Sequence, residues 1–231
     1  MLESLKKEVY EANLQLPALG LVTFTWGNVS GIDRETGLVV IKPSGVAYEE
    51  LSPEQMVVVN LAGEVVEGTL RPSSDTKTHV RLYQAFPEIR GIVHTHSLHA
   101  VAFAQAMRPI ACLGTTHCDT FAGTVPCIRE LTAEEIEEDY EGNTGHVIVE
   151  EFQKAGIDPM AIPGCVCAHH GPFTWGTSPM EAVVHAKVLE EVAHMNALTV
   201  ALNPDVSDIP AAYLNKHFSR KHGKEAYYGQ N

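Results

Sequence analysis

The order of hydrophobic and polar residues divides the chain into helical and extended segments. Helical periodicity recurs in five segments, at residues 1–14, 75–86, 97–107, 145–156 and 179–201. Short runs rich in Val and Thr, bounded by Gly, Pro or Asp, predict strands at residues 22–30, 38–42, 56–61, 64–68 and 91–96. The two kinds of segment alternate without a repeat or a linker, which predicts one domain spanning residues 1–231.

Local signals mark where some of these helices begin. Ser178 and Glu181 have the spacing of a capping box, and Pro179 stands at the first helical position between them. Thr132 predicts the start of an acidic helical stretch, which we interpret as a solvated face. The last twenty residues carry little apolar periodicity, so the sequence predicts a tail, from about residue 210 to 231, that is either frayed or ordered from outside the domain core.

Composition narrows the classes of partner. The net charge of −13 argues against nucleic acid or an anionic membrane as the main partner. No apolar run approaches the roughly 18 residues of a membrane span, and the N-terminal segment has no signal-peptide pattern. Five cysteines without framework spacing favour a reducing compartment, so we expect a cytoplasmic protein with buried thiols.

Histidines provide the strongest chemical signal. His94 and His96 flank Thr95 in a predicted strand, where residues two apart point to the same side. His170 follows another apolar run and precedes a Gly-Pro pair that ends regular pairing, so it is a better third ligand than His169. Three imidazoles with open positions are typical of a catalytic zinc site. The spacing predicts one divalent metal per subunit, most simply Zn²⁺, although a His-x-His pair can also be incidental.

Small-residue turns form a second signal. Gly27-Asn28, Ser44-Gly45 and Ser73-Ser74 each adjoin a predicted element, and their amides and hydroxyls suit a phosphate group. Lys42 would add positive charge. The alternative is ordinary turn chemistry and helix capping, and Asp75 could either cap its helix or serve as a carboxylate near the metal.

Together these motifs resemble the class II sugar-phosphate aldolase/epimerase family, most closely its L-ribulose-5-phosphate 4-epimerases. The similar segments run over nearly the full length, at residues 21–31, 41–46, 65–79, 91–97, 113–119, 170–176, 214–223 and 226–230. The resemblance implies a three-layer α/β/α domain with a mixed, mostly antiparallel sheet. It also implies a cyclic homotetramer with active sites between subunits.

The resemblance further assigns roles to residues. His94, His96 and His170 would bind the metal, with Asp75 beside or on the ion. Asp119 and Tyr228 would be the acid/base pair, and His217 and Arg220 would reach into a neighbouring subunit's site. The remaining substrate-binding residues would be Gly27, Asn28, Lys42, Ser44, Gly45, Ser73 and Ser74.

The implied reaction is the interconversion of L-ribulose 5-phosphate and D-xylulose 5-phosphate, as in arabinose catabolism. The hydrogen on C4 is not acidic, so inversion requires cleavage of the C3–C4 bond and re-addition of the fragments after the aldehyde has rotated. A divalent metal would polarise the C2 carbonyl. An aldolase or dehydratase on the same scaffold is the first alternative, although the aspartate at position 75 fits the epimerase pattern better than the glutamate of the aldolases. The second alternative is a non-catalytic module resembling the adducin head domain, for which the three histidines would be unexpected.

Overall fold

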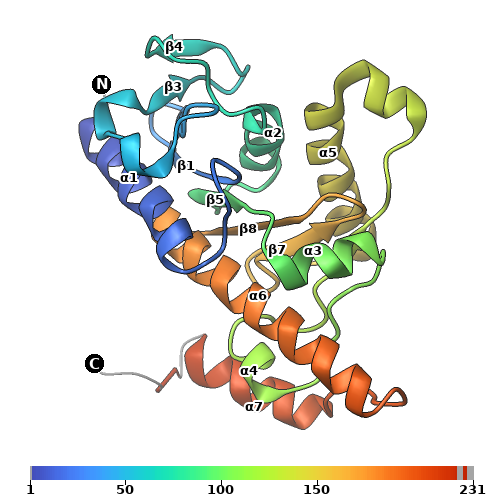
Figure 1. Ribbon diagram of the computed structural model, residues 1–231. Helices are drawn as coiled ribbons and strands as arrows, with labels where there is room; N and C mark the ends of the chain where they lie inside the picture. Colours follow the sequence, from blue (N-terminus) through green and yellow to red (C-terminus); the bar gives the residue numbers. More distant parts are fainter. Residues whose placement is uncertain (1, 223–225, 228–231) are drawn as a thin grey trace.

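The computed structural model describes residues 2–222 and 226–227, and its centre is a sheet ordered β4-β3-β2-β1-β5-β8-β7-β6 (Figure 1). Its strands are β1 (Asn28–Asp33), β2 (Leu38–Ile41), β3 (Val57–Val59), β4 (Val65–Glu67), β5 (Gly91–His94), β6 (Cys127–Ile128), β7 (Gly164–Cys167) and β8 (Pro172–Gly176). Within the described residues, β6 and β7 are parallel and the other neighbouring strands are antiparallel. This confirms the predicted mixed, mostly antiparallel sheet.

Helices cover both faces of this sheet. They are α1 (Glu3–Ala18), α2 (Thr76–Ala85), α3 (Leu98–Gln105), α4 (Thr115–Cys118), α5 (Ala133–Ala155), α6 (Pro179–Leu202) and α7 (Ala211–Lys221), with short 3-10 helices at Tyr48–Glu50 and Pro53–Gln55. Helices α2 and α5 pack on one face, and α1, α3 and α6 pack on the other (Figure 1). The predicted three-layer α/β/α domain is therefore confirmed.

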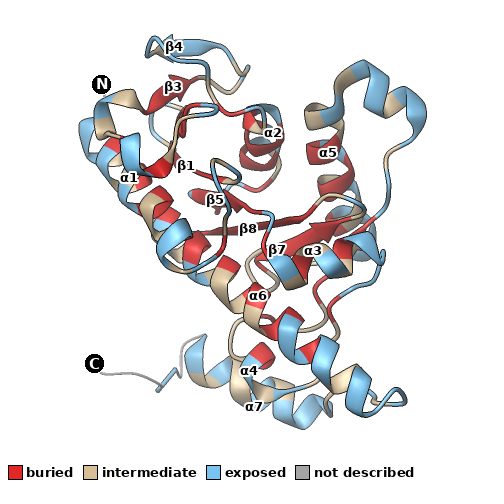
Figure 2. Ribbon diagram, viewed as in Figure 1, coloured by how far each residue is buried: buried red, intermediate tan, exposed pale blue. Residues whose placement is uncertain are grey.

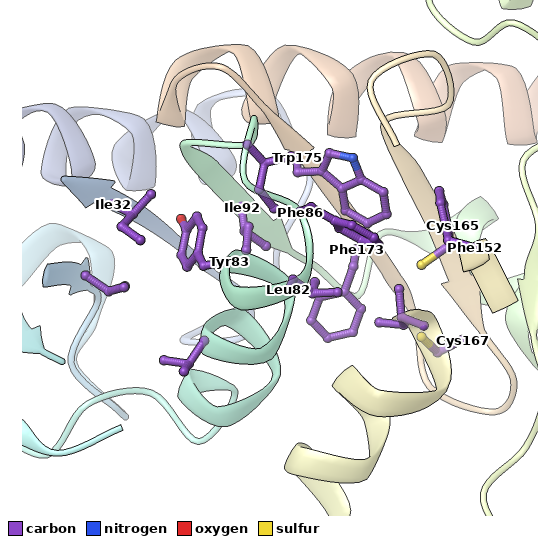
Figure 3. Packing of buried hydrophobic residues seen from close by; sticks show 14 of the residues in the cluster. Ile32, Leu82, Tyr83, Phe86, Ile92, Phe152, Cys165, Cys167, Phe173 and Trp175 are labelled. Carbon is purple, nitrogen blue, oxygen red and sulfur yellow. The ribbon is translucent and has the colours of Figure 1, made fainter. Parts of the chain in front are cut away.

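Alternation along the strands explains the two cores. Val57 and Val59 join the cluster under α2 and α5, whereas Val58 between them packs with α1 and α6. The cluster under α2 and α5 contains the large rings of Phe152 and Trp175, whose centroids are 5.2 Å apart (Figure 3). Because both faces of β3 are buried, its sequence is a continuous run of valine.

The predicted strand at residues 22–30 is wrong over residues 22–27. Strand β1 begins only at Asn28, because Phe24 and Gly27 have φ values of +54° and +77° and leave the extended conformation. The loop made by residues 22–27 instead runs along the cavity described below. The strand predicted at 91–96 also ends early, at His94.

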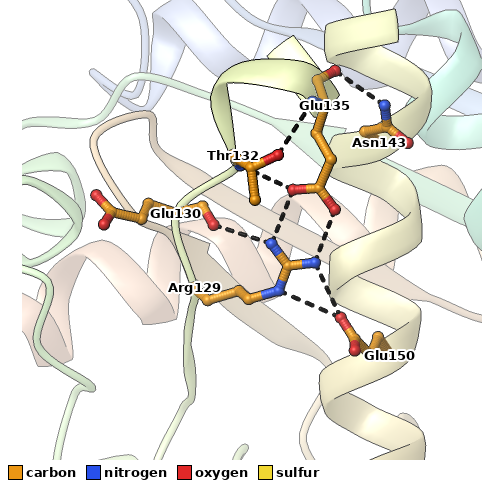
Figure 4. A network of polar contacts seen from close by, with 6 residues as sticks. All are labelled: Arg129, Glu130, Thr132, Glu135, Asn143 and Glu150. Carbon is orange, nitrogen blue, oxygen red and sulfur yellow. Dashed lines mark hydrogen bonds and ion pairs between the residues drawn. The ribbon is translucent and has the colours of Figure 1, made fainter. Parts of the chain in front are cut away.

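Helix α5 joins two segments that the sequence predicted separately. Its N-terminus is fixed by Thr132, whose hydroxyl accepts from the Glu135 amide, and by Arg129, which pairs with Glu135 and Glu150 (Figure 4). Asp139 interrupts the helix with φ −165° and ψ 83°, and its carboxylate accepts from Lys77 at 2.8 Å. The kink lets one helix cover the sheet and still reach the cavity.

The first half of the predicted tail forms a helix. Residues 211–221 form α7, which has no buried residue and lies against α4 (Figures 1 and 2). Polar contacts with α4, described below, take the place of the missing apolar stripe. Among the described residues, no helix is both long and apolar enough to cross a membrane.

Candidate active site

A cavity of about 520 Å³ opens where the start of β1 lies beside the end of β5. Most residues predicted from the sequence to bind metal or substrate line it. These are Gly27, Asn28, Lys42, Ser44, Gly45, Ser73, Ser74, Asp75, His94, His96 and His170. Segments far apart in sequence therefore converge on one hollow.

Three histidines converge at the base of this cavity. The ligand atoms of His94, His96 and His170 all lie within 4.8 Å of one another. His94 ends β5 and is 2% exposed, while His96 lies beyond the strand and is exposed to solvent. His170 lies in the turn between β7 and β8, where the left-handed φ of +61° at His169 turns the chain. The backbone thus brings His94 and His96 together without a strand continuing to His96.

Hydrogen bonding and burial prepare these rings as ligands. The Nδ1 of His94 donates to the carbonyl of Pro172 at 3.0 Å when it carries the proton, which leaves Nε2 with a free lone pair. Burial lowers the pKa of His170 to about 3, with a further contribution from His94. The pKa of His96 is also lowered, by partial desolvation inside the cavity and by His94. At neutral pH these two rings are uncharged, the form that binds a cation.

Asp75 lies beside the histidines and is held by other residues. It precedes α2, but its side chain makes no capping bond to that helix. Instead its carboxylate accepts from the Asn28 amide at 2.6 Å and lies 3.5 Å from the Ser73 hydroxyl. Burial would raise the pKa of Asp75, but His94 and His79 together with the Asn28 bond lower it. Among the residues that the structure describes, the group of converging ligand atoms consists of His94, His96 and His170, and Asp75 lies beside it.

The lining of the cavity also carries hydrogen-bond donors. In the part of the chain that the structure describes, the amides of Gly45 and Ser74 have no acceptor, and the hydroxyls of Ser44 and Ser74 are also unpaired. Lys42 is 2% exposed, and its ammonium donates to the carbonyl of Val46 at 2.7 Å. Burial lowers the pKa of Lys42 to about 8. Unpaired amides, hydroxyls and one cation are suited to a phosphate.

The comparisons with known proteins agree with this geometry. The family model for the class II aldolase and adducin N-terminal domain matches residues 7–197. The chain belongs to this family. An L-fuculose 1-phosphate aldolase is 22% identical, with a TM-score of 0.78 and 94% and 95% of the two chains covered. The YgbL protein from Klebsiella pneumoniae, described as an aldolase, epimerase or decarboxylase, is 26% identical, with a TM-score of 0.73 and 94% and 99% covered.

A third similar structure is the L-fuculose-1-phosphate aldolase from Thermus thermophilus. It is 24% identical, with a TM-score of 0.66 and 89% and 98% of the two chains covered. Class II aldolases act on sugar phosphates, use a divalent metal and are commonly oligomeric. The protein is an enzyme of this superfamily, and its three histidines have the chemistry needed to bind such a metal.

An unpartnered atom supports the fit of a cation to this class II aldolase site. The Nδ1 of His170 is buried and has no hydrogen-bond partner among the described residues. An unpaired ring nitrogen in a buried site is costly, whether or not it carries the proton, unless another group or an ion lies against it. A metal on one ring nitrogen fixes the proton on the other, as the Pro172 contact already does for His94.

Three of the remaining predicted residues, Asp119, His217 and Arg220, lie elsewhere. Asp119 follows α4 and its carboxylate accepts from Arg220 at 3.0 and 2.6 Å, with His217 at 3.2 Å and Lys221 at 3.6 Å. None of these four residues lines the cavity, and α4 and α7 lie apart from β5 (Figure 1). Burial would raise the pKa of Asp119, but Arg220 and His217 lower it. Tyr228 lies outside the described residues.

Five cavity residues were not predicted from the sequence, namely Thr25, Trp26, Pro43, Tyr140 and Glu141. Tyr140 and Glu141 of α5 line the cavity, and the Tyr140 ring centroid is 5.7 Å from that of His170. Glu141 is held through its carbonyl, which accepts from Thr78 at 2.6 Å. The acidic stretch concealed both residues, since they follow the kink at Asp139 that no local pattern announces. The sequence signal that could have identified this region was Tyr140, an aromatic residue within an acidic run.

Proposed function

We propose that this enzyme epimerises L-ribulose 5-phosphate to D-xylulose 5-phosphate at C4 by retro-aldol cleavage and re-addition. The observation that supports this most directly is that one cavity is lined both by the three histidines and by donors suited to an anion. A ketopentose 5-phosphate would place its carbonyl end near the histidines and its phosphate near these donors. We further propose that the ion is zinc, one per subunit.

The metal end would be formed by His94, His96 and His170. An ion held there would supply a Lewis acid to the C2 carbonyl and so favour the enediolate left by C3–C4 cleavage. Asn28 holds the Asp75 carboxylate beside the three rings, and its own Oδ1 is buried without a partner among the described residues. That oxygen is suited to accept a bond from a sugar hydroxyl.

The phosphate end would retain the aldehyde fragment between cleavage and re-addition. Amides of Gly45 and Ser74, the hydroxyl of Ser44 and the ammonium of Lys42 would hold glycolaldehyde phosphate while its aldehyde group rotates. An aldolase must release this fragment, whereas an epimerase must keep it. Firm binding of phosphate is therefore a requirement of the proposed reaction.

Proton transfer would involve Asp119 and Tyr228, with His217 and Arg220 beside them. Within one chain Asp119 is outside the cavity, so we propose that the Asp119 cluster of one subunit completes the cavity of its neighbour in a cyclic tetramer. The lowered pKa makes Asp119 a carboxylate at neutral pH, suited to accept a proton. The unperturbed pKa of a tyrosine is about 10, so Tyr228 would carry a proton to donate.

A class II aldolase is the second candidate, because L-fuculose-1-phosphate aldolases are among the similar structures. The test is a coupled assay for D-xylulose 5-phosphate with L-ribulose 5-phosphate as substrate, beside an assay for free dihydroxyacetone. Epimerase activity predicts D-xylulose 5-phosphate without accumulation of fragments. Accumulation of dihydroxyacetone, or cleavage of L-fuculose 1-phosphate at a higher kcat/KM, would instead identify an aldolase.

A further inference from the structure

Two buried thiols lie in contact next to Asp119. The Sγ atoms of Cys112 and Cys118 are 3.4 Å apart, and the two side chains are 3% and 0% exposed. A disulfide has a bond length of about 2.05 Å, so each sulfur needs to move by less than about 1 Å to form one. Both cysteines are free thiols in the structure.

The surrounding backbone is suited to such a movement. Cys112 lies in an irregular segment, and Cys118 ends α4, a helix of four residues. The Sγ of Cys118 lies 3.3 Å from the Gly114 carbonyl and donates its proton there. A bond between the sulfurs would close a small ring over residues 112–118 without disturbing any strand of the sheet.

We propose that Cys112 and Cys118 form a reversible intrachain disulfide on exposure to peroxide, and that this disulfide lowers activity by displacing Asp119. One thiol, as its thiolate, attacks a peroxide oxygen, which gives a sulfenic acid and, for hydrogen peroxide, releases water. The second sulfur then attacks the sulfenic sulfur and releases a second water. Two thiols are oxidised by two electrons in total, and one peroxide is reduced to two waters. Reduction by an external thiol restores the pair.

The displacement caused by the disulfide would reach Asp119 through the backbone. Asp119 follows Cys118 directly, and its amide donates to the Thr115 carbonyl at 3.1 Å, inside the ring that would close. Oxidation also removes the Cys118 proton that binds Gly114. A shift of about 1 Å in a catalytic group can reduce a rate by about a hundredfold.

The backbone of Cys112 is hydrogen-bonded to the segment that precedes α7. The carbonyl of Cys112 accepts from the Ile209 amide at 2.8 Å, just before α7. Helix α7 carries His217 and Arg220, the residues that contact the Asp119 carboxylate. Closing the ring would therefore strain both sides of this contact, the carboxylate on one and its cations on the other.

Burial of the two thiols limits the rate of their oxidation. Burial raises the pKa of the Cys112 thiol to about 12, with a further contribution from Cys118, so its thiolate is scarce. Oxidation must therefore wait for local opening of the short α4 segment, and small peroxides would react faster than bulky disulfides. The pair would respond to sustained oxidative conditions and be insensitive to brief ones.

The experiment uses the reduced, metal-loaded oligomer treated with hydrogen peroxide. Free thiols are then blocked, the protein is digested without reductant, and a peptide linking Cys112 to Cys118 is sought by its mass, lower by two hydrogens. Rates are measured before and after oxidation and again after dithiothreitol. We expect the linked peptide, at least a tenfold loss of rate, and recovery on reduction. The Cys112→Ser variant should keep its basal rate and resist peroxide, and Cys118→Ala serves if that variant folds poorly.

Cys127→Ser is the matched control, because Cys127 is more exposed than either member of the pair. It should remain as peroxide-sensitive as wild type. Absence of the linked peptide, a linked protein with full activity, or a Cys112→Ser variant inactivated like wild type would each overturn the proposal. The loss of rate rests on the role proposed for Asp119, whereas the mass measurement does not. Wild-type activity in Asp119→Asn would refute that role, whereas the mass measurement would still test whether the disulfide forms.

Discussion

Asn28 and His94 are cross-strand partners at the ends of β1 and β5. The amide that holds Asp75 and the most buried of the three imidazoles are therefore fixed by the same pair of strands. A shift in strand register would move both at once. The first predictions concern this pair and the residues around it.

Replacing His96 with Asn should remove most of the bound metal and lower kcat at least about a hundredfold, since one of three ligands is lost. The fold should survive, because His96 is exposed and lies beyond β5. Metal analysis, circular dichroism and the epimerase assay test this. His169→Asn is the control: His169 contacts Glu130 at 3.2 Å, and Asn tolerates its left-handed backbone. Equal metal content in the two variants would contradict the assignment.

Substitutions at two glycines distinguish the effect of backbone strain from that of a steric clash. Gly27 and Gly45 have similar φ values of +77° and +71°. A Cβ on Gly27 would lie 2.8 Å from the His94 carbonyl, whereas one on Gly45 would meet nothing within 4 Å. Gly45→Ala should therefore cost only about 1 kcal/mol of unfolding free energy, and Gly27→Ala distinctly more.

Denaturant unfolding and metal content measure this difference. Gly27→Ala should also bind metal more weakly, because relieving the contact moves His94. Gly45→Ala should retain its metal even if its KM changes through the phosphate site. Similar losses in both variants would mean that Gly27 is needed only for its backbone conformation.

These observations show how far the sequence specifies the site. Local pattern predicted the strands that contribute Asn28 and His94, and the turns that contribute Ser44 and Ser74, because periodicity and turn chemistry are local properties. It also predicted that His170 and not His169 would join the other histidines.

Three features depended on tertiary contacts and could not be predicted in the same way. The loop before β1 has a valine- and threonine-rich sequence that favours a strand, yet it turns at Phe24 and Gly27. The kink at Asp139 brings Tyr140 to the cavity through a contact with Lys77 from another helix. Helix α7 forms despite its weak apolar pattern because Asp119 binds its cations. Each outcome is decided by residues distant in sequence.

Lys42→Met should raise the KM for L-ribulose 5-phosphate about tenfold to a hundredfold, with a smaller change in kcat. Loss of one charge-assisted hydrogen bond to phosphate accounts for this magnitude. Lys7→Met is the matched control, since Lys7 is an exposed lysine of α1 that does not line the cavity. A KM that is unchanged in Lys42→Met would exclude the lysine from the phosphate site.

The pH dependence of KM provides a second test of Lys42. Burial lowers its pKa to about 8, so the ammonium is present below this pH and is lost above it. Binding of the phosphate dianion should be strongest below about pH 8 and weaken as the pH rises. The wild-type KM should therefore increase above pH 8, whereas the KM of Lys42→Met should stay nearly constant. Parallel profiles for the two proteins would assign the titration to another group.

The shared-site proposal predicts which inactive variants can rescue each other. His96→Asn damages the cavity, whereas Asp119→Asn and Tyr228→Phe damage the cluster that we propose to reach a neighbour. Tyr228→Phe should lower kcat far more than it raises KM, and like Asp119→Asn it should keep its metal. Mixing His96→Asn chains with Asp119→Asn chains should create hybrid sites in which cavity and cluster are both intact.

For random exchange of equal amounts, roughly a quarter of the sites would be intact in a cyclic oligomer. Mixing Asp119→Asn with Arg220→Met is the control. Asp119 binds Arg220 of its own chain, so every cluster in that mixture keeps one lesion and activity should not recover. Exchange is verified with a mass tag on one parent. If exchange is complete and the first mixture stays inactive, cavity and cluster do not combine across subunits, and Asp119 must act outside the site formed by the three histidines.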